Sequence, residues 1–309
     1  MATSISIASC TIKSYIPPVF NICEKEISTR TQTLCANPKP IFSVQDHNNA
    51  IYVRNPECWC YDLREQLTCC SPWNSYGTNQ RAGTLITPRH IAYTKHYPIP
   101  TGTTIRFVTK DNEVVTRTIT LTANVGNVPW PSPPDIDIGL LDQDVPDTIK
   151  PCYILPDNYL DYLSYINIPS LSTTSIPYPP GMICLDQEEK ALINDFPMFI
   201  GNNQSGAGGL VVGPSKPNKS ILWEDIIGGD SGNPAFLIYE GKLVLITMWT
   251  APYGGSSVIY YKNAIHDCID FLDTQAGDVT GYRMQQVSFE GSRAIDRITR
   301  TDVKLYNSL

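Results

Sequence analysis

The residues whose types and spacing best fit a chemical reaction form the run Gly228-Gly229-Asp230-Ser231-Gly232-Asn233-Pro234. The glycines allow a tight turn that exposes the Ser231 Oγ and directs main-chain N–H groups toward one point. A nucleophilic serine needs that geometry, because its attack on a carbonyl creates a negatively charged oxygen. A short Gly/Asp/Ser/Pro cluster is also typical of an ordinary turn, so Ser231 alone leaves both interpretations open.

A nucleophilic serine also needs a base, and the chain has four histidines: His47, His90, His96 and His266. Two of them follow the stretch Gly83-Thr84-Leu85-Ile86-Thr87-Pro88-Arg89. This segment resembles the histidine strand of trypsin/chymotrypsin-type serine proteases, in which a few apolar residues lead to the catalytic histidine. The resemblance places the base on His96 and gives His90 the place of a buried packing residue.

The acid of a catalytic triad is predicted from residues 135–141, Asp-Ile-Asp-Ile-Gly-Leu-Leu, which resemble the Asp-Ile-Ala-Leu-Leu strand of the same family. The match puts the acid on Asp137, and we interpret Asp135 and Asp142 as solvated turn or edge acids. The order His, Asp, Ser along the chain is that of chymotrypsin, whereas subtilisin-like and α/β-hydrolase enzymes use other orders.

The resemblance covers roughly residues 76–272 and implies an all-β fold. The expected fold is two antiparallel Greek-key β-barrels with the triad at their junction, a C-terminal helix and an N-terminal extension. The N–H groups of Gly229 and Ser231 are the expected oxyanion hole. The implied reaction uses neither a metal ion nor a cofactor.

Asp230 has a particular role in secreted relatives, where this acid pairs with a new N-terminus released by cleavage. We find no matching Arg/Lys-Ile-Val-Gly-Gly segment before Gly83. We therefore expect another cationic or N–H partner for Asp230, and activity without processing.

Two residues are candidates for substrate binding. Asp225 lies six residues before Ser231, where trypsin-like enzymes have the pocket acid that selects Arg or Lys, and Trp249 resembles the tryptophan of the pocket wall. Thr250 and Val258 fall where the family often has glycine, so their side chains narrow or block the pocket. Asp225 is accordingly either a buried pocket acid or an exposed loop acid beside Glu224.

Ten cysteines are many for a chain of 309 residues, and seven lie within the first 70. Tyr97 and Arg81 stand where the extracellular relatives carry a disulfide next to the catalytic histidine. The cluster Cys58, Cys60, Cys69 and Cys70 is compatible with a zinc site, with disulfides or with reduced thiols, since its spacing is not that of a usual zinc knuckle.

Composition excludes several other functions. The formal net charge of −7 argues against nucleic acid as the main partner, because phosphate binding needs a basic face. No apolar run is long enough for a transmembrane helix. The first residues have neither a basic region nor an apolar core, so we expect no signal peptide and a cytoplasmic or non-classically released protein.

The chain divides by pattern into four parts. We predict a cysteine-rich extension over residues 1–75, a first barrel over 76–170, a second barrel with its closing helix over 171–272, and a polar tail over 273–309. Alternating residues predict a hairpin over 103–122, and apolar runs predict strands at 243–249 and 258–261. Apolar residues at helical spacing predict a helix from 264 to 272.

The sequence thus predicts a serine endopeptidase that acts on peptide or protein substrates, and a buried Asp225 would give it a trypsin-like preference for Arg or Lys. The same site would serve an esterase. The competing class is a catalytically silent protease fold used for binding or assembly, since fold does not fix function. The two unassigned ends of the chain are a propeptide, a docking segment or part of a larger assembly, and the oligomeric state stays open.

Overall fold

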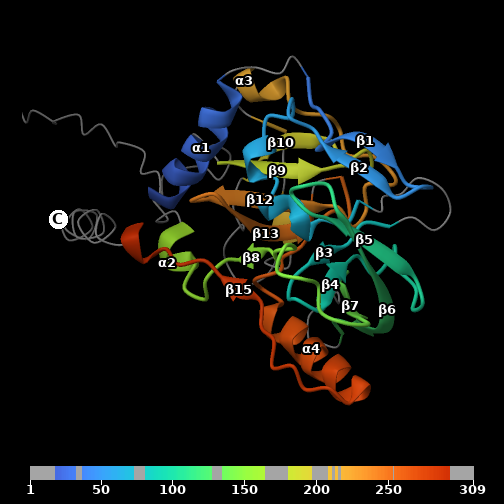
Figure 1. The fold of residues 1–309 in the computed structure, drawn as a ribbon. Helices are drawn as coiled ribbons and strands as arrows, with labels where there is room; N and C mark the ends of the chain where they lie inside the picture. Colours follow the sequence, from blue (N-terminus) through green and yellow to red (C-terminus); the bar gives the residue numbers. More distant parts are fainter. Residues whose placement is uncertain are drawn as a thin grey trace, which may run out of the picture.

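The computed structural model describes residues 18–32, 37–72, 81–126, 134–163, 180–196, 208–210, 213–214, 217–252 and 254–292. Over these residues the chain is mostly β-sheet with few helices, and two sheets carry the candidate site (Figure 1). None of the helices in this part of the chain is long and apolar enough to cross a bilayer.

The first sheet curls into a half-barrel. Among the described residues its antiparallel strands run in the order β3 (Thr84–Leu85), β4 (His90–Tyr93), β7 (Asp137–Leu141), β6 (Val114–Asn124) and β5 (Thr104–Val108). β5 and β6 form the predicted hairpin, and Asn112 in its turn has a φ of 72°, which asparagine tolerates. A bulge between Ile119 and Leu121 bends the long strand β6 and adds to the curl.

The second sheet has the described order β10 (Ala191–Asp195), β9 (Gly181–Leu185), β12 (Pro234–Tyr239), β13 (Lys242–Met248), β8 (Tyr153–Ile154) and β15 (Gln285–Gln286). β12 and β13 form a hairpin whose turn residues, Glu240 and Gly241, both have positive φ, as a two-residue turn of this kind requires. β8 pairs in parallel with both β13 and β15. The sheet is therefore not the purely antiparallel one that the resemblance implies.

Helix α4 (Lys262–Ala276) is the predicted closing helix, and it contacts β6 and β7 of the first sheet (Figure 1). It ends at Gly277, whose φ of 73° is the usual left-handed end of a helix. The strand predicted at 258–261 is wrong, because these residues form the turn that leads into α4. Val258 is nevertheless fully buried, which explains the apolar run.

The described N-terminal part of the chain packs against the second sheet. Helix α1 (Pro18–Thr31) contacts β9 and β12 (Figure 1), and the segment after it forms the hairpin β1 (Phe42–Asp46) and β2 (Ile51–Arg54). The backbone N–H groups of Ile41 and Ala191 donate to the carbonyls of Glu189 and Lys39, respectively. The described residues before 75 are thus part of the main core and not a separate extension.

The prediction of a polar tail over residues 273–309 is wrong for residues 273–292, which are part of the fold. β15 completes the edge of the second sheet, and Phe289 packs its ring edge-on against Tyr239 and Tyr162, with centroid distances of 4.7 and 5.5 Å. Residues 293–309 lie outside the described residues, as do the loop at 127–133, the predicted linker at 168–179 and residues 201–207.

Shorter elements complete the described fold. These are β11 (Gly208–Leu210) paired with β14 (Gly254–Ser256), helices α2 (Leu160–Leu163) and α3 (Pro217–Ser220), and 3-10 turns at Tyr61–Leu63, Gln66–Cys69 and Glu290–Ser292.

Candidate active site

The predicted base and nucleophile come from different sheets and meet. His96 lies three residues after β4, and Ser231 lies three residues before β12. The distance from His96 Nε2 to Ser231 Oγ is 2.8 Å. Such a contact lets an imidazole accept the serine proton. The His96 side chain keeps 44% of its surface exposed, so a ligand in solution can reach the pair.

The carboxylate that orients His96 is Asp135. Its Oδ2 lies 2.5 Å from His96 Nδ1, and its Oδ1 accepts the backbone N–H of His96 at 2.8 Å. The backbone N–H of Asp135 in turn donates to the Oγ of Ser256 on β14 at 2.9 Å. The prediction that Asp135 is a plain solvated acid is wrong, and the role of Ser256 was not foreseen.

Asp137, the predicted triad acid, is not at His96. It is the first residue of β7, and its Oδ1 accepts a hydrogen bond from the side chain of Asn124 at 2.7 Å. Burial raises the pKa of its carboxyl, while the Asn124 hydrogen bond opposes that shift.

The register of two strands explains why Asp135, and not Asp137, lies at His96. β4 and β7 run antiparallel with Tyr93 opposite Asp137. Moving from Tyr93 toward His96 therefore means moving from Asp137 toward lower numbers on the other strand. The acid nearest His96 is consequently the one that precedes β7, which is Asp135.

A cation–π contact stabilises the segment beside His96. The guanidinium carbon of Arg81 lies 3.4 Å from the centre of the Tyr97 ring. Contacts of this kind contribute about 0.5–2 kcal/mol, depending on how far they are desolvated. Tyr97 follows His96 directly, so the contact fixes the turn that carries the base.

Asp230, next to the nucleophile, is held by backbone donors. Only 1% of the residue is exposed, and its two carboxylate oxygens accept the N–H groups of Gln187 at 2.9 Å and Ile227 at 2.7 Å. Burial raises the pKa of the Asp230 carboxyl, and the two N–H groups act in the opposite direction. These contacts are the alternative N–H partners that the sequence analysis anticipated.

The turn around Ser231 requires glycine at two positions. Gly229 and Gly232 have φ values of 110° and 91°, a region that other residues rarely adopt. The N–H of Gly232 donates to the carbonyl of Trp249, and the N–H of Trp249 donates to the carbonyl of Asn233. The turn is therefore tied to the end of β13.

The two predicted substrate-binding residues, Asp225 and Trp249, lie in different surroundings. Asp225 is exposed, which is the loop alternative, and the neighbouring Glu224 forms an ion pair with Lys190 at 2.9 Å. Trp249 is only 1% exposed, and its indole N–H donates to the carbonyl of Leu185 at 3.2 Å. Asp225 thus faces solvent and Trp249 fills the core, and the role of each toward a substrate stays a prediction.

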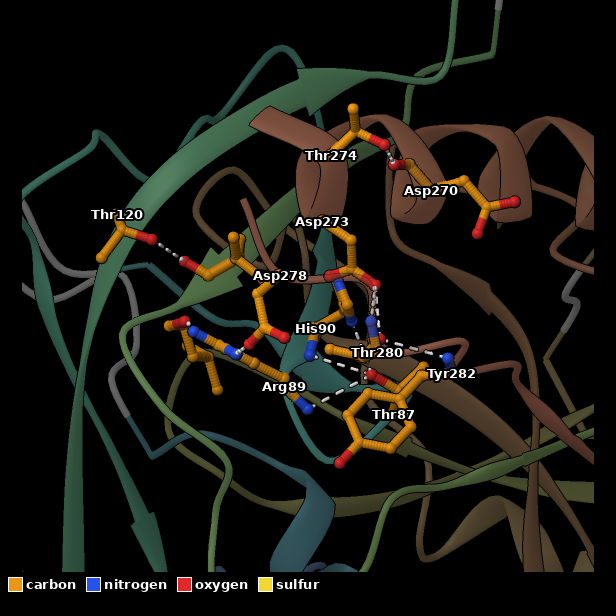
Figure 2. A network of polar contacts seen from close by, with 12 residues as sticks. Thr87, Arg89, His90, Thr120, Asp270, Asp273, Thr274, Asp278, Thr280 and Tyr282 are labelled. Atoms are coloured by element: carbon orange, nitrogen blue, oxygen red, sulfur yellow. Dashed lines mark hydrogen bonds and ion pairs between the residues drawn. The ribbon is translucent and has the colours of Figure 1, made fainter. Parts of the chain in front are cut away.

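His90 is a buried packing residue, as the sequence predicts, within a polar network between β4 and the end of α4 (Figure 2). Its Nδ1 lies 2.8 Å from the Thr87 hydroxyl. Its Nε2 lies 3.2 Å from an oxygen of buried Asp273, although the geometry is not that of a hydrogen bond. Figure 2 shows Thr280 on the same Asp273 carboxylate, where its backbone N–H donates at 3.2 Å.

This network predicts a loss of stability in acid. Burial lowers the pKa of His90 from 6.5 to about 4, although Asp273 opposes the shift. As the pH falls through this interval, the unfolded chain binds a proton that folded His90 does not, so the free energy of unfolding decreases. Below about pH 4 both states are protonated at this position and the decrease stops.

Urea unfolding of the wild type and of His90→Gln at pH 7 and pH 5 measures this effect. We expect the wild type to lose more stability between these two values than the variant. His47 and His266, whose pKa values burial also lowers, are present in both proteins, so the difference isolates His90. Equal losses in the two proteins would contradict the prediction.

The described cysteines are thiols. The sulfur atoms of Cys58 and Cys60 are 3.5 Å apart and those of Cys69 and Cys70 are 3.7 Å apart, well beyond the length of a disulfide. Among the residues that the structure describes, no group of three or more His, Cys, Asp or Glu side chains is arranged to hold a metal ion. The zinc and disulfide alternatives for this cluster therefore have no support here.

No protein-family model and no curated protein matches this chain. The geometry of Ser231, His96 and Asp135 is therefore the basis on which a function can be assigned.

Proposed function

We propose that this protein is a serine endopeptidase of the trypsin/chymotrypsin type that works through an acyl-enzyme intermediate. The observation that carries the proposal is the continuous set of contacts from Ser231 Oγ through both nitrogens of His96 to the carboxylate of Asp135. A serine, a base and an orienting acid in contact are recognised by geometry and not by sequence position. The half-barrel that carries His96 and the second sheet that leads to Ser231 support the two-barrel fold, which remains part of the proposal.

In this mechanism, His96 Nε2 takes the proton of Ser231 as the Oγ attacks the acyl carbon of the substrate. Asp135 holds the proton of Nδ1, fixes the tautomer and stabilises the imidazolium that forms. The N–H groups of Gly229 and Ser231 stabilise the negative oxygen of the tetrahedral intermediate. His96 then gives its proton to the leaving amine, and water enters to release the acyl group by the reverse sequence of proton transfers.

The site is proposed to be active without proteolytic processing. Asp230 already has N–H donors on both carboxylate oxygens, so a newly released ammonium group is not needed to neutralise it. The described residues before 75 belong to the core, which removes the interpretation of that whole region as a detachable propeptide.

The substrate is proposed to be a peptide or protein, and the same residues would hydrolyse an ester. The exposed position of Asp225 gives no support to a preference for Arg or Lys, so the proposal names no preferred side chain. The competing function, a silent binding module, shares the fold but predicts no reactivity at Ser231.

A fluorophosphonate probe distinguishes these functions. The purified full-length chain is treated with the probe, with Ser231→Ala as the control, and the adduct is located by mass spectrometry. Labelling of the wild type at Ser231 alone is the expected result, and cleavage of a peptide library then separates peptidase from esterase. An intact, folded chain that is not labelled would support the silent module, and labelling that appears only after N-terminal trimming would contradict activity without processing.

A further inference from the structure

The side chain of Gln187 lies against the turn that is expected to bind the oxyanion. A Cβ built on Gly229 would fall 2.3 Å from Gln187 Oε1 and 3.0 Å from its Cδ. Such distances do not occur between real atoms, so the Gln187 carboxamide occupies the space beside the Gly229 Cα. Position 229 needs glycine for its positive φ, and a larger residue there would also displace the end of the Gln187 side chain.

Gln187 contacts the same turn a second time through its main chain. Its N–H donates to Asp230 Oδ1, and Asp230 lies between Gly229 and Ser231. One residue thus lies against both the glycine whose N–H is proposed to bind the oxyanion and the aspartate that anchors the turn. Replacing the Gln187 side chain leaves the main-chain hydrogen bond in place, so the two contacts can be tested separately.

The loop that carries Gln187 is fixed from two sides. Asp186 Oδ1 accepts the backbone N–H groups of Glu188 and Lys190, both at 2.8 Å. The amide side chain of Gln45, in the N-terminal hairpin, donates to the carbonyl of Glu188 at 3.0 Å. Hydrogen bonds within the loop and from the N-terminal hairpin therefore restrain the backbone around Gln187.

We propose that Gln187 is a positioning residue for the oxyanion-binding turn. By filling the space beside the Gly229 Cα, its carboxamide keeps the N–H of Gly229 at the position where negative charge develops. The proposal rests on the proposed function, because it assigns a role within the same reaction. Gln187 itself forms and breaks no bond.

The expected change in kcat depends on how far each Gln187 variant displaces the N–H donor of Gly229. Complete loss of one donor costs about 10²–10³-fold in kcat, so a donor that is only less well placed should cost about tenfold. We therefore expect Gln187→Ala to lower kcat about tenfold with an unchanged KM. Gln187→Met, which restores the bulk, should recover most of the rate.

Gln187→Glu tests whether the side chain is close to the developing charge. This variant keeps the size of the side chain but places a carboxylate beside the oxyanion, and like charges at short distance repel each other. We expect a lower kcat than for Gln187→Met, and the ratio of the two kcat values should approach one as the pH falls toward the pKa of the new carboxyl, because protonation of His96 lowers both rates alike. A purely structural role would not produce that pH dependence.

The experiment compares wild type, the three Gln187 variants and Glu188→Ala, an exposed neighbour in the same loop, by ester hydrolysis and thermal unfolding. The expected result is a reduced kcat in Gln187→Ala and Gln187→Glu, with Glu188→Ala like the wild type. Three results for Gln187→Ala would overturn the role of Gln187 alone. They are a kcat equal to that of the wild type, an effect on KM without an effect on kcat, and a fall in kcat that a matching loss of thermal stability explains. A folded wild type with no turnover would instead overturn the proposed function and, with it, this role.

Discussion

Asp135→Asn should lower kcat about 10⁴-fold, the size known for the equivalent change in the triad template. The Asp135 carboxylate accepts from both His96 Nδ1 and the His96 backbone N–H. An asparagine keeps the size of the side chain but offers an NH₂ group, which favours the wrong imidazole tautomer. His96 would then have no free Nε2 lone pair for the serine proton.

Asp137→Asn is the matched control, since it makes the same substitution two residues further along the chain. Asp137 contacts Asn124 and not His96, so kcat should stay close to that of the wild type. Both variants are compared by steady-state ester hydrolysis and by circular dichroism, which confirms that they are folded. The reverse result, a severe loss at Asp137 and a mild one at Asp135, would show that the sequence resemblance places the acid correctly and the register described here does not.

Lys219→Met should reduce the free energy of unfolding by about 3–5 kcal/mol, because it leaves buried carboxylates without their cation. The Lys219 ammonium is fully buried, 2.5 Å from Glu24 on α1 and 3.3 Å from buried Asp195 at the end of β10. Glu24 also accepts the backbone N–H of Gly181, the first residue of β9. The ion pair therefore ties the N-terminal helix to the edge of the second sheet.

Lys39→Met is the control for that prediction. Lys39 pairs with Glu57, whose side chain is 72% exposed, and exposed pairs contribute about 0–1 kcal/mol. Urea unfolding followed by tryptophan fluorescence gives both free energies. Equally small losses in the two variants would mean that the contact between Lys219 and α1 is not important for stability.

Local patterns predicted the parts of the fold that local residues determine. Alternating side chains identified the hairpin of β5 and β6, and apolar spacing identified α4. Helix α1 carried the same kind of signal in Val19, Phe20, Cys23 and Ile27, all buried at helical spacing, and could have been predicted. The position of the nucleophile beside the base was also within reach, since each lies in a recognisable segment.

The choice between Asp135 and Asp137 could not be made from the sequence. In a strand, residues two apart lie on the same face, so the pattern Asp-Ile-Asp-Ile fits either assignment. The pairing of Tyr93 with Asp137 shows that Asp135 is the acid nearer to His96. That pairing depends on how two distant strands align, which the pattern of one strand does not reveal. β15 was missed for a related reason, because Gln285 and Gln286 are exposed and polar and become a strand only by pairing with β8.

The attachment of α1 to the second sheet has a consequence for how the protein is made. The buried face of α1 meets β9, which begins at Gly181, and β12, which begins at Pro234, so some 200 residues must follow the helix before both of its partner strands exist. At a synthesis rate of about 5–20 residues per second, that delay is roughly 10–40 s. During this time Phe20 and Ile27 lack the complete native sheet that buries them, and the long sequence separation also slows the packing of the helix on the sheet afterwards. The nascent chain is therefore expected to depend on chaperones, and a lowered temperature or chaperone co-expression should raise its soluble yield.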